Sequence, residues 1–94
     1  MKHCIIAKFN DIVDDKAAMI ERIEALFTSD PAMDGVRGCT VLRNCVDREN
    51  RYDLAIVIDM DKAALPAWDA SELHREWKSR FGSYLAAKAI FDFE

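Results

Sequence analysis

Residues 2–9 read Lys-His-Cys-Ile-Ile-Ala-Lys-Phe, and this apolar stretch with spaced polar residues decides the fold. Its length favours a strand, and the helix-breaking pair Asn10-Asp11 that follows it supports this interpretation. Successive side chains of a strand point to opposite faces, and two largely apolar faces are typical of a strand covered on both sides. One face is expected to carry His3, Ile5, Ala7 and Phe9, and the other Cys4, Ile6 and Lys8. A histidine on an apolar face is the first candidate for chemistry.

The composition predicts one folded domain that spans residues 1–94. The chain is 51% hydrophobic and 32% charged, which allows both a buried core and a soluble surface. Its net charge is −4 and its basic residues are scattered, which argues against a nucleic-acid partner. The sequence has no long apolar segment and no basic-then-apolar stretch, so we expect neither a membrane span nor export. Three cysteines without CxxC spacing, Cys4, Cys39 and Cys45, favour reduced thiols and a cytoplasmic location.

Two amphipathic helices are expected. Met19, Ile20, Ile23, Leu26 and Phe27 repeat at helical spacing, which predicts a helix over about 15–28, preceded by acidic capping residues and closed by Ser29-Asp30-Pro31. Asp61 is expected to cap a short helical piece, with Pro66 biasing Leu65 away from helix. A second helical stripe starts near Asp69 or Ser71 and comprises Leu73, His74, Trp77, Phe81, Tyr84 and Leu85.

Three further strands complete the pattern. Residues 36–45 read as a strand, and residues 51–60, across a polar turn, are rich in β-branched side chains. The two are expected to form a hairpin, with a bulge at Gly38. Residues 88–93 form the last strand, with Ala89, Phe91 and Phe93 on one face and Ile90 and Asp92 on the other.

The resulting order is βαββαβ, which predicts an α+β, ferredoxin-like fold. Its four-stranded antiparallel sheet would carry both helices on one face. The other face would expose apolar side chains such as Ile6, Phe91 and Phe93, and a patch of this kind needs a partner. We therefore expect a homodimer that packs sheet against sheet.

Motifs spread over the whole chain resemble one family. They are Lys2-His3, Lys8-Phe9, Gly35-Val36, Asn44, Asn50-Arg51, Tyr52-Asp53-Leu54, an aromatic residue six positions before a histidine (Trp68 and His74), and the closing Ile90-Phe91-Asp92-Phe93-Glu94. In this order and spacing they resemble the stress-responsive A/B barrel domain (Dabb) family, a group of dimeric α+β barrels.

The resemblance implies a dimeric α+β barrel with a small-molecule cavity between the sheet and helices of each subunit. We expect no cofactor. In plant polyketide cyclases of this family, a histidine and a tyrosine act as acid and base. His74 matches the histidine, whereas Trp68 stands at the tyrosine position and has no phenol. A further histidine of the cyclases falls near Leu54. Cyclase activity therefore does not carry over, and most bacterial members have no assigned activity.

His3, His74 and Asp92 are the candidate catalytic residues. The last strand should lie beside the first, which would place Asp92 near His3, and His74 should reach the same end from the second helical region. A carboxylate fixes the tautomer of an imidazole, and a second imidazole could serve as general acid. The equally open alternative is that these are hydrogen-bonded polar residues of a small core. Metal binding is disfavoured, because no short HxH or HxxxH spacing is present.

Candidate ligand contacts are Ile5, Trp68, Trp77, Phe81 and Ile90, although aromatic residues at helical spacing are more often plain core. Two functions follow. The first is a Dabb-type protein whose cavity holds a small molecule, with no assigned activity. The alternative is a small enzyme, cyclase-like or lyase-like, that uses histidine acid–base chemistry. The sequence leaves open whether the protein is an enzyme.

Overall fold

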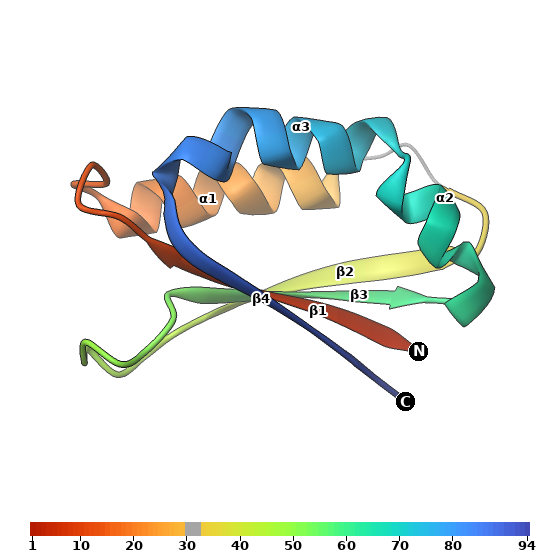
Figure 1. Cartoon of the computed structure of the whole chain (residues 1–94), viewed down its shortest axis with the longest axis horizontal. Helices are drawn as coiled ribbons and strands as arrows, with labels where there is room; N and C mark the ends of the chain where they lie inside the picture. The colour runs from red at the N-terminus through yellow and green to blue at the C-terminus, as the bar shows by residue number, and fades with distance from the viewer. Residues whose placement is uncertain (30–32) are drawn as a thin grey trace.

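The computed structural model describes residues 1–29 and 33–94. The elements in chain order are β1 (Lys2–Phe9), α1 (Lys16–Thr28), β2 (Val36–Arg43), β3 (Leu54–Met60), η1 (Lys62–Ala64), α2 (Leu65–Asp69), α3 (Glu72–Phe81), η2 (Gly82–Tyr84) and β4 (Leu85–Phe93). The four strands form one antiparallel sheet in the order β2-β3-β1-β4. Helices α1 and α3 lie side by side on one side of this sheet, as Figure 1 shows. The predicted ferredoxin-like arrangement is confirmed.

Strand β1 lies at the centre of the sheet and pairs with both β3 and β4. The side chains of its helix-facing side are almost fully buried, as alternation predicts; they are His3, Ile5, Ala7 and Phe9. On the opposite side, Lys2 and Lys8 remain partly exposed at the two ends of the strand. The apolar character of both faces of residues 2–9 therefore agrees with the central position of β1 in the sheet.

Both long helices begin at side-chain caps. Asp15 accepts a hydrogen bond from the backbone N–H of Ala18 at 3.0 Å and starts α1, while Ser71 accepts from that of His74 at 3.1 Å and starts α3. Ser29 is the C-terminal cap of α1. Asp30 and Pro31, which were also expected to close this helix, lie outside the described residues.

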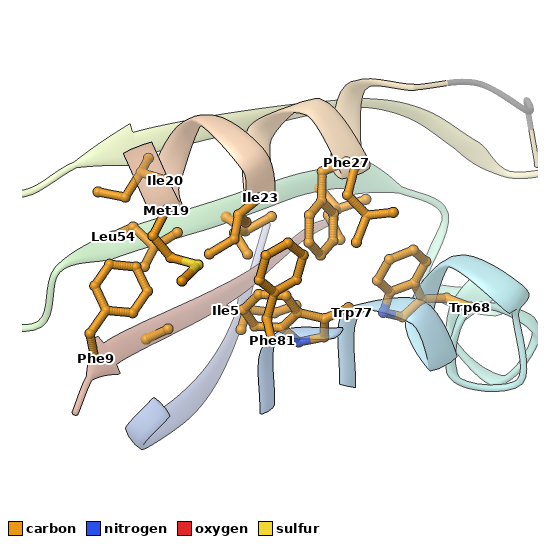
Figure 2. Close-up of a cluster of buried hydrophobic side chains, with 14 of the residues drawn as sticks. Ile5, Phe9, Met19, Ile20, Ile23, Phe27, Leu54, Trp68, Trp77 and Phe81 are labelled. Carbon is orange, nitrogen blue, oxygen red and sulfur yellow. The ribbon is translucent and has the colours of Figure 1, made fainter. Parts of the chain in front are cut away.

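The core fills the space between the helices and the sheet. Figure 2 shows Ile23 and Phe27 of α1 facing Trp77 and Phe81 of α3, above Ile5 of β1. The Phe27 and Trp77 rings meet edge to face with centroids 5.4 Å apart, a favourable aromatic geometry. This aromatic contact joins α1 to α3 above the sheet.

The β2–β3 hairpin is present, but its strands are shorter than predicted. Strand β2 ends at Arg43 rather than at residue 45, and β3 begins at Leu54 rather than at residue 51. The side chain of Asn44 bonds locally to the main chain of Val46, and Asp53 accepts from the backbone N–H of Phe9 at 2.8 Å. One backbone bond continues past the strand ends, from the Asn44 N–H to the Asp53 carbonyl at 3.0 Å, and the Asn44 side chain bonds locally beyond it. The predicted bulge is confirmed by the register shift between Val36 and Gly38.

Two expectations for the second helical region are wrong. Leu65 adopts helical backbone angles and Pro66 lies in the first turn of α2, where a missing N–H costs nothing. Helix α3 ends at Phe81, so Tyr84 lies in η2 and Leu85 begins β4. The apolar stripe ran through this boundary because both residues pack against the same core as the helix.

Among the helices of residues 1–29 and 33–94, none combines the length and the hydropathy that crossing a membrane requires.

Candidate functional site

His3 and Asp92 face each other on neighbouring strands β1 and β4. They are direct partners in the strand register, and the His3 Nδ1 lies 2.5 Å from the Asp92 Oδ1. The His3 side chain is 7% exposed and that of Asp92 is 37% exposed, so the pair lies at the boundary between core and solvent. Because a carboxylate only accepts, Nδ1 donates and Nε2 is left as the basic nitrogen. The expected proximity of these two residues is confirmed, whereas their catalytic role stays a prediction.

His74 lies on α3 and does not join this pair directly. In the described part of the chain, no hydrogen bond connects its ring to His3 or Asp92. Burial lowers the pKa of His74, and the nearby Lys78 charge acts in the same direction. His74 is therefore a neutral imidazole at pH 7, the form that can act as a base.

Trp68 of α2 connects the two histidines. Its indole ring meets the His3 ring edge to face at 6.4 Å and the His74 ring edge to face at 5.6 Å between centroids. Trp68 is 1% exposed, and its Nε1–H has no hydrogen-bond partner among the described residues. A buried donor without a partner is rare in proteins. Of the three residues expected to cluster, His3 and Asp92 form a direct pair. His74 contacts this pair only through the ring of Trp68, which lies against both imidazoles.

A cavity of about 870 Å³ opens between the C-terminal end of α1, strand β2 and the α2–α3 segment. It lies over Ile58 of β3, on the helix-covered face of the sheet. Its apolar walls are Leu26, Phe27, Val36, Cys39, Ile58 and Leu73. A cavity of this size falls within the range of small-molecule sites.

Two titratable side chains of the cavity lining, Cys39 and Arg37, have raised pKa values. Burial raises the pKa of the Cys39 thiol to about 11, and the Glu24 carboxylate acts in the same direction, so the thiol is protonated at pH 7. The exposed charged residues of the lining, Arg37, Glu72 and Glu76, define the mouth of the cavity. Arg37 donates hydrogen bonds to Asp61 at 2.5 Å and to Asp59 at 3.1 Å. Hydrogen bonds to Asp61 and then Asp59 raise the pKa of Arg37 above its ordinary value.

The five predicted ligand-contact residues are spread over three environments. Trp68 lines the cavity. Ile5, Trp77 and Phe81 belong to the closed core (Figure 2), and Ile90 is 51% exposed on β4, beyond the cover of the helices. Ligand contact by these four residues stays a prediction.

Sequence reasoning missed Cys39 and the other β2 and α1 residues that line the cavity. Alternation along β2 indicates that Cys39 and Val41 share the helix-facing side, so part of the signal was available. The cavity itself depends on how far α1 and α3 separate over β2, which hydrophobic periodicity does not encode. Within the described ranges, no group of three or more His, Cys, Asp or Glu side chains is arranged to hold a metal ion.

A four-stranded ferredoxin-like sheet with an apolar helix-free face and a cavity under its helices defines the class of small α+β barrel domains. The sequence matches the Stress responsive A/B Barrel Domain family, Dabb, over residues 1–94. The chain belongs to this family. No curated protein matches the sequence.

Solved structures with the same fold come from several bacteria. A dimeric protein of unknown function from Bacteroides fragilis has a TM-score of 0.80 at 15% identity, over 99% of this chain and 93% of that one. A dimeric ferredoxin-like protein from Thermobifida fusca has a TM-score of 0.78 at 20% identity, over 98% and 87%. A Dabb family protein from Mesorhizobium loti has a TM-score of 0.72 at 14% identity, over 99% and 93%. At these identities the likeness concerns the fold.

Proposed function

We propose that this Dabb protein is a homodimeric small-molecule-binding protein whose ligand occupies the cavity between α1, β2 and the α2–α3 segment. The observation that carries this proposal is the cavity itself, with a volume of about 870 Å³ and largely apolar walls. Burial of apolar ligand surface would supply most of the affinity, as in typical small-molecule sites. The free state of Cys4, Cys39 and Cys45 supports a cytoplasmic, reducing location.

The helix-free face of the sheet supports the homodimer. Alternation places two cross-strand rows of mostly apolar side chains on it, namely Thr40, Val57, Cys4 and Phe91, and Leu42, Ala55, Ile6 and Ala89. Phe91 is 63% exposed and stacks on Phe93, with ring centroids 6.0 Å apart. The related proteins from B. fragilis and T. fusca are described as dimeric. A second copy would cover this face with an identical apolar surface.

Ligand binding is tested through Cys39, which lines the cavity. At pH 8 its alkylation by iodoacetamide is expected to be slow, because a pKa of about 11 leaves about one thiol in a thousand ionised. As long as the pH stays below that pKa, each increase of one pH unit should raise the alkylation rate about tenfold, because the thiolate is the reacting form. A ligand in the cavity, probed with 5-phenylpentan-1-ol, is expected to slow the reaction further. Mass spectrometry of the modified peptide measures the rate.

Cys45 provides an internal control in the same sample. It is exposed in the β2–β3 connection and does not line the cavity. Its alkylation rate should not change when the probe is added. Equal protection of Cys45 and Cys39, or no protection of Cys39 at saturating probe, contradicts binding in this cavity.

The second candidate is acid–base chemistry at His3, with Asp92 as a positioning residue and His74 as the second proton-transfer group. The 2.5 Å contact between Nδ1 and Oδ1 favours it, because it fixes one tautomer of a buried imidazole. Trp68 offers no exchangeable phenol at its position, so any chemistry would depend on the two imidazoles.

Asp92→Asn tests this pairing while keeping the side-chain shape. In the wild type the neutral His3 ring should carry its proton on Nδ1, since the carboxylate can only accept. An amide can instead donate to Nδ1, so the variant should show a larger population with the proton on Nε2. Long-range ¹H–¹⁵N NMR of the ring measures the tautomer. Asp11→Asn, in the exposed turn before α1, serves as control. A wild-type ring without a proton on Nδ1 contradicts the pairing.

A further inference from the structure

The hydroxyl groups of the cavity act toward a ligand as acceptors rather than donors, and this property limits what they can bind. Three hydroxyl groups line it, and each donates its hydrogen to a main-chain carbonyl. Thr28 donates to Glu24 at 2.7 Å, Ser29 to Leu26 at 2.8 Å and Ser71 to Trp68 at 2.7 Å. A hydroxyl whose hydrogen is already used offers a ligand only its lone pairs.

Arg37, the cation at the cavity mouth, is already paired with two carboxylates. Both guanidinium nitrogens that Arg37 uses for ion pairing face carboxylates, Asp61 at 2.5 Å and Asp59 at 3.1 Å. Arg37 keeps three further N–H groups, but its positive charge is already balanced by the Asp59 and Asp61 carboxylates. The apolar walls cannot solvate an anion either, since burial of an unpaired charge is strongly unfavourable.

The carboxylates at the mouth have fewer basic partners than Arg37 has acidic ones. Glu72 lies in the first turn of α3 and makes no salt bridge within the described residues. Glu76, one turn later, has Arg80 at 3.5 Å, and Arg80 also lies over the Phe81 ring. Both carboxylates are exposed, so their field is screened by solvent but still acts on a charge at the mouth.

We infer that the cavity selects apolar molecules that carry an amine, and that it rejects apolar carboxylates of the same shape. This inference rests on the proposed ligand-binding function and names the ligand class of that site. The ammonium group would lie at the mouth, where Glu72, Glu76 and the hydroxyl lone pairs accept its hydrogen bonds. The apolar part would occupy the space above Ile58.

Three probes with one body and different head groups test the charge preference. They are 5-phenylpentylamine, 5-phenylpentan-1-ol and 5-phenylpentanoate, measured at pH 7.5 and low salt by protection of Cys39 from alkylation. We expect the amine to bind about tenfold more tightly than the carboxylate, with the alcohol between them. Added salt should reduce this ratio, because the interacting charges are near the surface.

Glu72→Gln assigns the preference to the mouth. It keeps the shape and the acceptor oxygen but removes the charge, so the amine should bind about threefold more weakly while the alcohol is unaffected. The control, Glu21→Gln, removes the same charge from an exposed position of α1 that does not line the cavity, and should change nothing.

The outcomes separate the two proposals. If all three probes protect Cys39 equally, or the carboxylate protects best, the charge preference is wrong and the binding cavity stands. If none protects Cys39, both the ligand class and the ligand-binding function are wrong. If Glu21→Gln weakens the amine as much as Glu72→Gln does, net charge rather than the cavity mouth determines the preference, which also overturns the inference.

Discussion

Replacing Phe91 with glutamate is expected to convert the proposed dimer into monomers. Phe91 is 63% exposed on the helix-free face and would be buried in a sheet-to-sheet interface. Two-fold symmetry would place the new carboxylate in the interface twice, without a partner charge. We expect the dissociation constant to rise at least about a hundredfold, which corresponds to about 2.7 kcal/mol or more. Sedimentation equilibrium over a range of micromolar concentrations measures the change.

Ile12→Glu is the matched control for this substitution. Ile12 is 68% exposed, similar to Phe91, but it lies in the turn before α1 and not on the sheet. Its replacement should leave association unchanged. A wild-type protein that sediments as a monomer at micromolar concentration contradicts the dimer, and so does a Phe91→Glu variant that associates as the wild type does.

Much of the fold could be predicted because its decisive signals are local. The alternation of residues 2–9 identifies a central strand, and the antiparallel topology then aligns the start of β1 with the end of β4. This alignment is why His3 and Asp92 could be placed together although 89 positions separate them. A strand register converts a local pattern into a long-range contact.

Element boundaries were less predictable, because tertiary contacts override local preference there. Tyr84 and Leu85 continue the apolar stripe of α3, yet the chain turns through η2 and enters β4. The backbone N–H of Asn10 bonds to the Tyr84 carbonyl at 2.9 Å, which ties this turn to the end of β1. Periodicity alone cannot distinguish a core residue of a helix from a core residue that follows it.

The candidate site also combines features that local sequence signals predict with features that depend on tertiary packing. The His3–Asp92 pair followed from strand register, whereas the position of His74 depended on a bulky neighbour. Both imidazole rings lie against the Trp68 indole, and side-chain volume of this kind is resolved only when the whole core is packed. The cavity over Ile58 depends likewise on the separation of two helices, a property of the assembled fold.

Gly35→Ala is expected to be strongly destabilising. Gly35 has a φ of +79°, in the left-handed region that costs a residue with a Cβ about 1–2 kcal/mol. An added Cβ would also lie 2.8 Å from the Ala64 Cβ, so the backbone entering β2 or η1 must shift, at a further cost of about 1–3 kcal/mol. The carbonyl of Gly35 accepts from the backbone N–H of Asp61 at 2.7 Å, and a shift would strain this bond.

The unfolding free energy should therefore fall by about 2–5 kcal/mol, measured by urea unfolding at fixed protein concentration with the fluorescence of the buried Trp68 and Trp77 as signal. Gly82→Ala is the matched control, because Gly82 has a helical φ of −55° and no atom within 4 Å of the added Cβ. That variant should be as stable as the wild type or more stable by up to about 1 kcal/mol. Equal stability of the two variants contradicts the assignment of Gly35 as the residue whose backbone conformation and close approach to Ala64 fix the entry to β2.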